Sequence, residues 1–119
     1  MPALETATAT DGVAEEIRRL ALGTINAQTG TAYTILATDN GNTITLSNTS
    51  PITLTVPSGL GADFQCRILQ ISTGQVTVTG SGATVNAYSG WTKLAGQHAG
   101  ATLIATASNV FNLSGNLTA

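Results

Sequence analysis

Few residues in this chain have the chemistry needed for nucleophilic or acid–base catalysis. Its 119 residues include one cysteine, Cys66, and one histidine, His98, and a cysteine nucleophile requires a base beside it. Cys66 lies in an alternating apolar segment and His98 among small residues, which favours structural roles for both. Asp39 and Asp63 lie in turn-like segments, where aspartate commonly caps its own backbone. We therefore expect no catalytic residues and no enzymatic activity.

The composition also disfavours a metal ion or a cofactor. A calcium site needs several clustered carboxylates, and a single histidine and a single cysteine offer little to a transition metal. Gly74, Gly80 and Gly82 lie in expected hairpin turns and not in the strand-to-helix loop that holds a phosphate. We therefore expect no metal, no cofactor and no phosphate-binding loop.

A ligand-binding surface is a stronger alternative than an active site. Tyr88, Trp91, Gln97 and His98 lie close together in the sequence. Carbohydrate-binding surfaces combine exposed aromatic rings with nearby amides, so these four residues form a candidate ligand surface. The competing interpretation places Trp91, the only tryptophan, in the core or in an interface, where its ring buries roughly 200 Å².

The distribution of charge divides the chain into two regions. Charged residues make up only 8% of the chain, against about 25% in an average domain. Most of them precede residue 20, and later in the chain only Asp39, Asp63, Arg67 and Lys93 are charged. The net charge of −2 argues against a nucleic-acid partner, and no apolar run approaches the ~18 residues of a membrane span. We expect one domain with neither a nucleic-acid nor a membrane partner.

Residues 1–30 are predicted to form an N-terminal arm with a short amphipathic helix at about residues 12–22. Val13, Ile17 and Leu20 recur at the spacing of one helical face. A helix this short is marginally stable alone, so these side chains need a surface to pack on. That surface is either one end of the same domain or another subunit of an assembly, which makes the three residues candidate assembly contacts.

Residues 31–119 are predicted to form an all-β body. The hydrophobic period changes to two, most clearly where Ile52, Leu54 and Val56 alternate with threonine. About eight short strands separated by glycine, asparagine or proline turns predict a β-sandwich or jelly-roll-like barrel. No later segment has a helical stripe that could connect parallel strands, so we expect largely antiparallel sheets.

Two details of the body give further expectations. Phe64, Cys66 and Ile68 alternate until Leu69 interrupts the pattern, which predicts a β-bulge at that point. The near absence of charge is unusual, because β-proteins commonly protect their sheet edges with charged side chains. We therefore expect copies of the same chain to cover these edges in a homo-oligomer.

Three stretches of the body resemble a module of bacteriophage virion proteins that occurs in capsid decoration (cement) proteins and in trimeric head and tail fibres. They are residues 32–41, with Ala-Tyr-Thr-Ile-Leu and Asp-Asn-Gly; residues 52–57, Ile-Thr-Leu-Thr-Val-Pro; and residues 94–117, with Gly-Gln-His-Ala-Gly-Ala-Thr-Leu and Phe-Asn-Leu-Ser-Gly-Asn-Leu. The chain departs from the family pattern at His98 and Phe111, where tyrosine and tryptophan are more usual.

The resemblance implies a β-rich virion module that is commonly trimeric and has no catalytic activity. Because 119 residues leave no room for a fibre shaft, we expect a homotrimeric decoration protein that binds the major capsid protein or other virion proteins and stabilises the head shell. The alternative is a short head-fibre, tail-fibre or tail-tip module that contacts the host surface and binds glycans. A free lectin-like domain is a third alternative. The expected location is the virion, on the capsid surface or in the tail.

Overall fold

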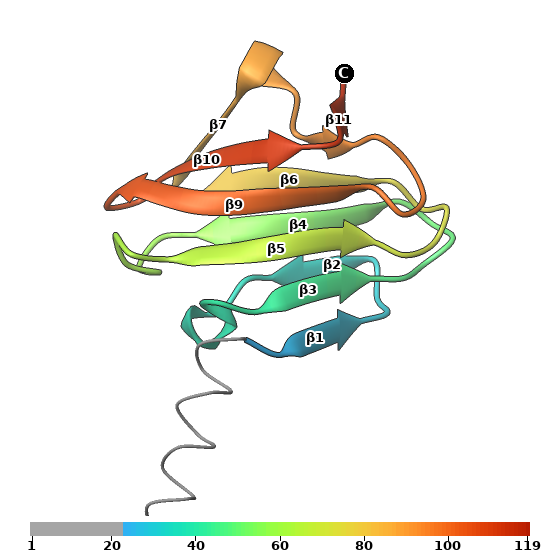
Figure 1. Ribbon diagram of the computed structural model, residues 1–119, viewed down its shortest axis with the longest axis horizontal. Coiled ribbons are helices and arrows are strands. Elements are labelled where there is room, and N and C mark those ends of the chain that lie inside the picture. The colour runs from blue at the N-terminus through green and yellow to red at the C-terminus, as the bar shows by residue number, and fades with distance from the viewer. Residues whose placement is uncertain (1–22) are drawn as a thin grey trace, which may run out of the picture.

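The computed structural model describes residues 23–119, so the predicted helix with Val13, Ile17 and Leu20 lies outside the described residues. The described part is all-β, with two sheets packed face to face and two short 3₁₀ turns (Figure 1). Its elements are β1 (Ile25–Gln28), β2 (Ala32–Thr34), η1 (Ala37–Asp39), β3 (Thr43–Leu46), β4 (Ile52–Pro57), β5 (Gln65–Gln70), β6 (Val76–Ser81), β7 (Thr84–Ala87), η2 (Tyr88–Gly90), β8 (Lys93–Leu94), β9 (Gly100–Ala107), β10 (Val110–Gly115) and β11 (Leu117–Thr118).

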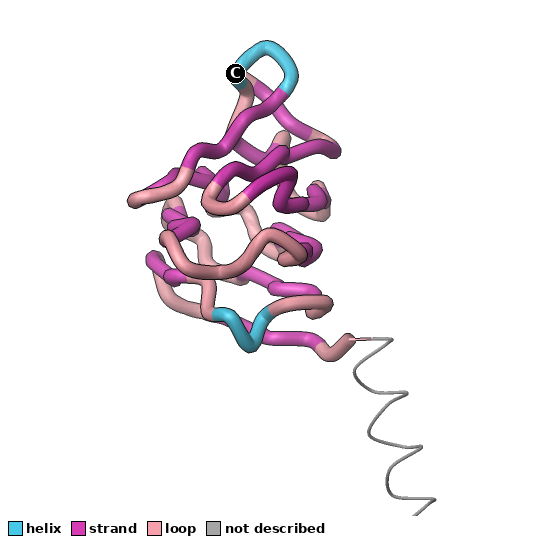
Figure 2. Tube along the Cα trace, turned by 90° about the vertical axis from the view of Figure 1, so that its left-hand side faces the viewer, coloured by secondary structure: helices cyan, strands magenta, loops and turns pink. Residues whose placement is uncertain are grey.

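The two sheets are built by a chain that changes sheet at almost every strand. The six-stranded sheet has the order β1-β3-β5-β9-β10-β7, and the five-stranded sheet has the order β11-β8-β6-β4-β2. From β1 to β6, odd strands stack in one sheet and even strands in the other, as in the coils of a solenoid (Figures 1 and 2). The hairpin β9–β10 then inserts between β5 and β7.

The expectation of largely antiparallel sheets is wrong. The pairs β1–β3, β3–β5, β2–β4, β4–β6 and β7–β10 are parallel. Antiparallel pairing is confined to β5–β9, β9–β10, β6–β8 and β8–β11. The expectation assumed that parallel neighbours require a helical crossover within one sheet. Here a strand of the opposite sheet provides the crossover, so the chain needs no helix there.

Strand β1 extends the body into the region predicted as the arm and its linker. It pairs in parallel with β3 from Ile25–Thr43 to Gln28–Leu46, so residues 25–28 belong to the six-stranded sheet. The sequence pattern concealed this strand because its half-buried positions carry polar residues, Asn26 and Gln28. The two-residue strand β11 was not predicted either.

The core lies between the sheets and follows the predicted alternation. Phe64 and Phe111 pack edge to face there, with ring centroids 6.2 Å apart and planes at 80°. Phe111, which stands where the phage module usually has tryptophan, is fully buried. Other fully buried side chains include Ile44, Leu46, Ile52, Leu54, Val56, Val76, Val78, Leu94, Leu103 and Leu113.

Strand β5 has no bulge at Leu69. The inward positions Cys66 and Ile68 are followed by Gln70, which is 0% exposed. Its Oε1 accepts a hydrogen bond from the Val76 N–H at 3.1 Å, and its Nε2 donates one to the Ser72 carbonyl at 3.0 Å. The alternation of inward and outward side chains therefore continues to Gln70, whose hydrogen bonds hold the β5–β6 turn. Leu69 lies on the outer face of the sheet. The register irregularity lies instead at Val110/Phe111 in the β9–β10 pair.

A buried carboxylate connects β1, β2 and η1 at the end of the body where the described chain begins. Asp39 is 3% exposed and accepts hydrogen bonds from Asn26 Nδ2 at 2.8 Å, the Tyr33 hydroxyl at 2.8 Å and the Leu36 N–H at 2.9 Å. Burial and the hydrogen bond to Asp39 raise the pKa of Tyr33. The Leu36 contact is a local cap, as expected for an aspartate in a turn, and the other two contacts fix β1 and β2 to η1.

Candidate functional site

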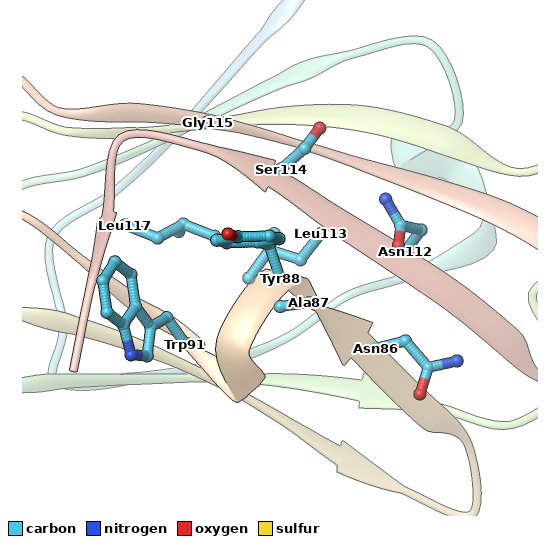
Figure 3. A pocket seen from close by; sticks show the side chains of 9 residues that line it. All are labelled: Asn86, Ala87, Tyr88, Trp91, Asn112, Leu113, Ser114, Gly115 and Leu117. Carbon is cyan, nitrogen blue, oxygen red and sulfur yellow. The ribbon is translucent and has the colours of Figure 1, made fainter.

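A groove of about 510 Å³ lies at the end of the body formed by β7, η2 and the last residues of β10 (Figure 3). Pockets of this size accommodate small-molecule ligands. The groove combines aromatic, aliphatic and amide side chains, and its lining residues are Asn86, Ala87, Tyr88, Trp91, Asn112, Leu113, Ser114, Gly115 and Leu117.

A tight turn after β7 presents the two aromatic side chains. Ser89 and Gly90 have left-handed backbone angles, with φ of 58° and 70°, and the Trp91 N–H donates a hydrogen bond to the Tyr88 carbonyl at 3.2 Å. The side chain of Tyr88 is 86% exposed and that of Trp91 is 40% exposed. The aliphatic side chains of Leu113 and Leu117 line the groove together with these two rings (Figure 3). The groove therefore has an apolar, aromatic part that solvent reaches.

The parallel pairing of β7 with β10 supplies the polar part of the groove. Asn86 and Asn112 are register partners in this pair, so the two residues lie next to each other on neighbouring strands. Ser114 follows two residues later in β10, on the same exposed side as Asn112. Gly115 continues this wall with φ of 141°, and a Cβ at that position would overlap the carbonyl oxygen of Gly100. Backbone thus forms the wall where β10 ends.

The structure brings together only half of the predicted ligand surface. Tyr88 and Trp91 line the groove, whereas Gln97 and His98 do not. Gln97 Nε2 donates to the Ile71 carbonyl at 3.2 Å, and the His98 N–H donates to the Gln70 carbonyl at 2.7 Å. The loop between β8 and β9 is thereby fixed to the β5–β6 connection, so proximity in sequence was misleading for these two residues.

Sequence reasoning missed the groove residues on β10 and β11, chiefly Asn112, Ser114 and Leu117. Asn86 and Asn112 occupy outward positions of alternating segments, which is the signal that the sequence carries. Their proximity follows from a parallel pairing between strands separated by the β8 and β9 segments. No local pattern indicates such a pairing.

The candidate nucleophile Cys66 lies in the core. It is buried in β5, and this burial, together with the charge of Asp39, raises the pKa of its thiol to about 12. The thiol is therefore protonated near neutral pH and is not an activated nucleophile. His98, its hypothetical base, is exposed on the β8–β9 loop.

Residues 23–119 contain no cluster of three or more histidine, cysteine, aspartate or glutamate side chains that could hold a metal ion. None of the helices in this described range is long and apolar enough to cross a membrane.

Two further hollows lie against the six-stranded sheet around Arg67, and neither contains an aromatic side chain. The groove at Tyr88 and Trp91 is therefore the candidate site.

No family model matches the chain, and no curated protein is significantly similar to it.

Proposed function

We propose that this protein is a structural component of a bacteriophage virion, a homotrimeric capsid decoration or cement protein that stabilises the head shell. The observation that carries the proposal is that, within residues 23–119, all four edge strands, β1, β2, β7 and β11, consist of uncharged residues. Uncharged edges offer unpaired backbone groups to other chains. The resemblance of three stretches of the body to phage virion modules supports the same function. The two-layer all-β body, whose first strands stack in parallel as in a solenoid, is compatible with the β-rich module that the resemblance implies.

Exposed apolar side chains at one end of the body add to this support. Ile25 on the edge strand β1 is 72% exposed, and Leu36, which precedes η1, is also exposed. Burial of such side chains against a sister chain or the shell stabilises the contact by roughly 25 cal/mol per Å². Because the decoration protein binds the assembled shell and not its dissociated subunits, this binding stabilises the shell by mass action.

The copy number of the protein in purified virions tests this proposal. A decoration protein is present in hundreds of copies for each particle, which quantitative mass spectrometry measures against the major capsid protein. A handful of copies would indicate a tail or fibre component, and absence from virions would refute the proposal. Light scattering of the purified protein tests the trimer, because a stable monomer at micromolar concentration contradicts it.

The arm provides a second test of shell binding. We expect the full-length triple variant Val13→Glu, Ile17→Glu and Leu20→Glu to lose co-sedimentation with capsid shells, because charge disfavours burial of this apolar set. The circular dichroism spectrum of the β body should not change. Unaltered co-sedimentation of the triple variant would remove the arm from the binding mechanism.

The second candidate function is a short head-fibre, tail-fibre or tail-tip module that contacts the host surface. The exposed aromatic groove at Tyr88 and Trp91 is the observation that favours it. The copy-number measurement separates the two candidates, because a module of this second kind is present in few copies.

A further inference from the structure

We infer that the groove between η2 and the end of β10 binds a neutral saccharide, with Tyr88 and Trp91 as the stacking surface and Asn86 and Asn112 as the hydroxyl-binding groups. This goes beyond the proposed decoration role and does not depend on it, because the groove is built within one copy of the chain.

The aromatic part of the groove suits the apolar face of a sugar ring. Tyr88 and Trp91 are exposed although they are the bulkiest side chains of the lining, and the left-handed turn at Ser89 and Gly90 holds them at the groove. Leu113 and Leu117 add aliphatic surface to the same groove (Figure 3). The C–H bonds of a pyranose face supply a surface that packs on such rings, while its hydroxyls remain free for polar contacts.

The amide part of the groove suits sugar hydroxyls. Asn86 and Asn112 are register partners on adjacent strands, so their backbones are about 4.8 Å apart, the spacing of neighbouring strands. Within the described part of the chain, neither side-chain amide forms a hydrogen bond. Each amide has a donor and an acceptor, and a hydroxyl also donates and accepts, so the two amides are able to bind hydroxyls of one ring.

The charge of the lining selects a neutral ligand. None of the nine lining residues is acidic, basic or a histidine. A carboxylate or an ammonium group in this groove would lose hydration without gaining a partner of opposite charge. We therefore expect discrimination against uronic and sialic acids and against cationic ligands.

The fluorescence of Trp91 provides a direct test, because Trp91 is the only tryptophan in the chain and lines the groove. The full-length protein is titrated with the methyl glycosides of glucose, galactose and N-acetylglucosamine, and with glucuronic acid. Concentrations up to ~20 mM detect dissociation constants in the millimolar range. We expect a saturable change in emission with at least one neutral glycoside and none with glucuronic acid.

Single substitutions then assign the binding to the groove. Asn112→Ala should weaken binding about tenfold, the equivalent of one hydrogen bond, and Tyr88→Ala should weaken it at least as much. Tyr88 is highly exposed, so its removal should leave the urea midpoint unchanged. The matched control is Ile104→Ala, which removes an exposed apolar side chain of β9 outside the groove and should bind as the wild type does.

Three results would overturn the inference. They are no response to any of the neutral glycosides, equal binding by the Tyr88→Ala variant, and an emission change that follows protein concentration instead of added sugar. The last result would show that a second copy of the chain occupies the groove. None of these results bears on the virion copy number, so this inference and the decoration role fail separately.

Discussion

Gln70 permits a quantitative test of how the body is held together. Its side-chain amide is fully buried and bridges the Val76 N–H and the Ser72 carbonyl. In Gln70→Leu these two groups lose their partner, while the volume of the side chain stays similar. A buried polar group without a partner costs about 1–3 kcal/mol. Since the Ser72 carbonyl is only part-buried, we expect a total loss of about 2–4 kcal/mol in the free energy of unfolding.

The assay is urea denaturation followed by circular dichroism and by Trp91 fluorescence. For a domain of this size, the expected loss lowers the urea midpoint by roughly 1–2 M. The matched control is Gln65→Leu, an exposed position in the same strand, which should shift the free energy of unfolding by less than about 0.5 kcal/mol. A Gln70→Leu variant as stable as this control would refute the bridging role.

The variant Gln70→Glu adds a dependence on pH. An ionised carboxylate accepts from the Val76 N–H but cannot donate to the Ser72 carbonyl, so burial raises the pKa of the new carboxyl in the folded state. A raised folded-state pKa gives stability at low pH that is lost as pH increases. We therefore expect near wild-type stability below about pH 4 and a large deficit at neutral pH. An equal deficit at both values would contradict the bridge.

Two further predictions concern close packing and titration in the core. A Cβ at Gly74 would overlap the carbonyl oxygens of Ser50 and Asn48, so Gly74→Ala should lose about 3 kcal/mol of stability, whereas Gly96→Ala, with open space, should change it by less than about 1 kcal/mol. Equal urea midpoints would be inconsistent with this packing. The pKa of Cys66 is raised from 9.0 to about 12, so the folded thiol stays protonated where the unfolded thiol ionises. Between pH 9 and 12, unfolding of the wild type should therefore become easier by about 1.4 kcal/mol per pH unit relative to Cys66→Ala. Parallel pH profiles of the two proteins would count against this burial effect.

The fold shows which structural features the alternation of apolar and polar residues can predict. The inward positions of β4, Ile52, Leu54 and Val56, follow directly from a period of two, since successive side chains point to opposite faces of a strand. The same period occurs in parallel and antiparallel strands, so it could not distinguish stacked coils from a meander. The prediction of a bulge at Leu69 was wrong for a related reason. Gln70 points into the core, and an inward glutamine can be inferred only when the turn with which it forms hydrogen bonds is known.

The candidate site was predictable to a similar extent. The residue types and spacing of Tyr88 and Trp91 predicted a ligand surface, and a single tight turn places both side chains on the groove. Gln97 and His98 were equally close in sequence, but the β8–β9 loop folds onto the β5–β6 connection. Asn112 lies in the groove because β10 pairs with β7, which places it next to Asn86.

The sequence by itself determined the class of the protein: an all-β body, uncharged over most of its length, with a core drawn from alternating apolar positions and two aromatic residues in one turn. These properties depend on residues within a few positions of each other, where strand geometry acts directly. The tertiary structure alone decided the parallel stacking of the coils, the inward Gln70 and the meeting of Asn86 with Asn112. These depend on contacts between distant segments, and their energies are realised only when both partners are in place.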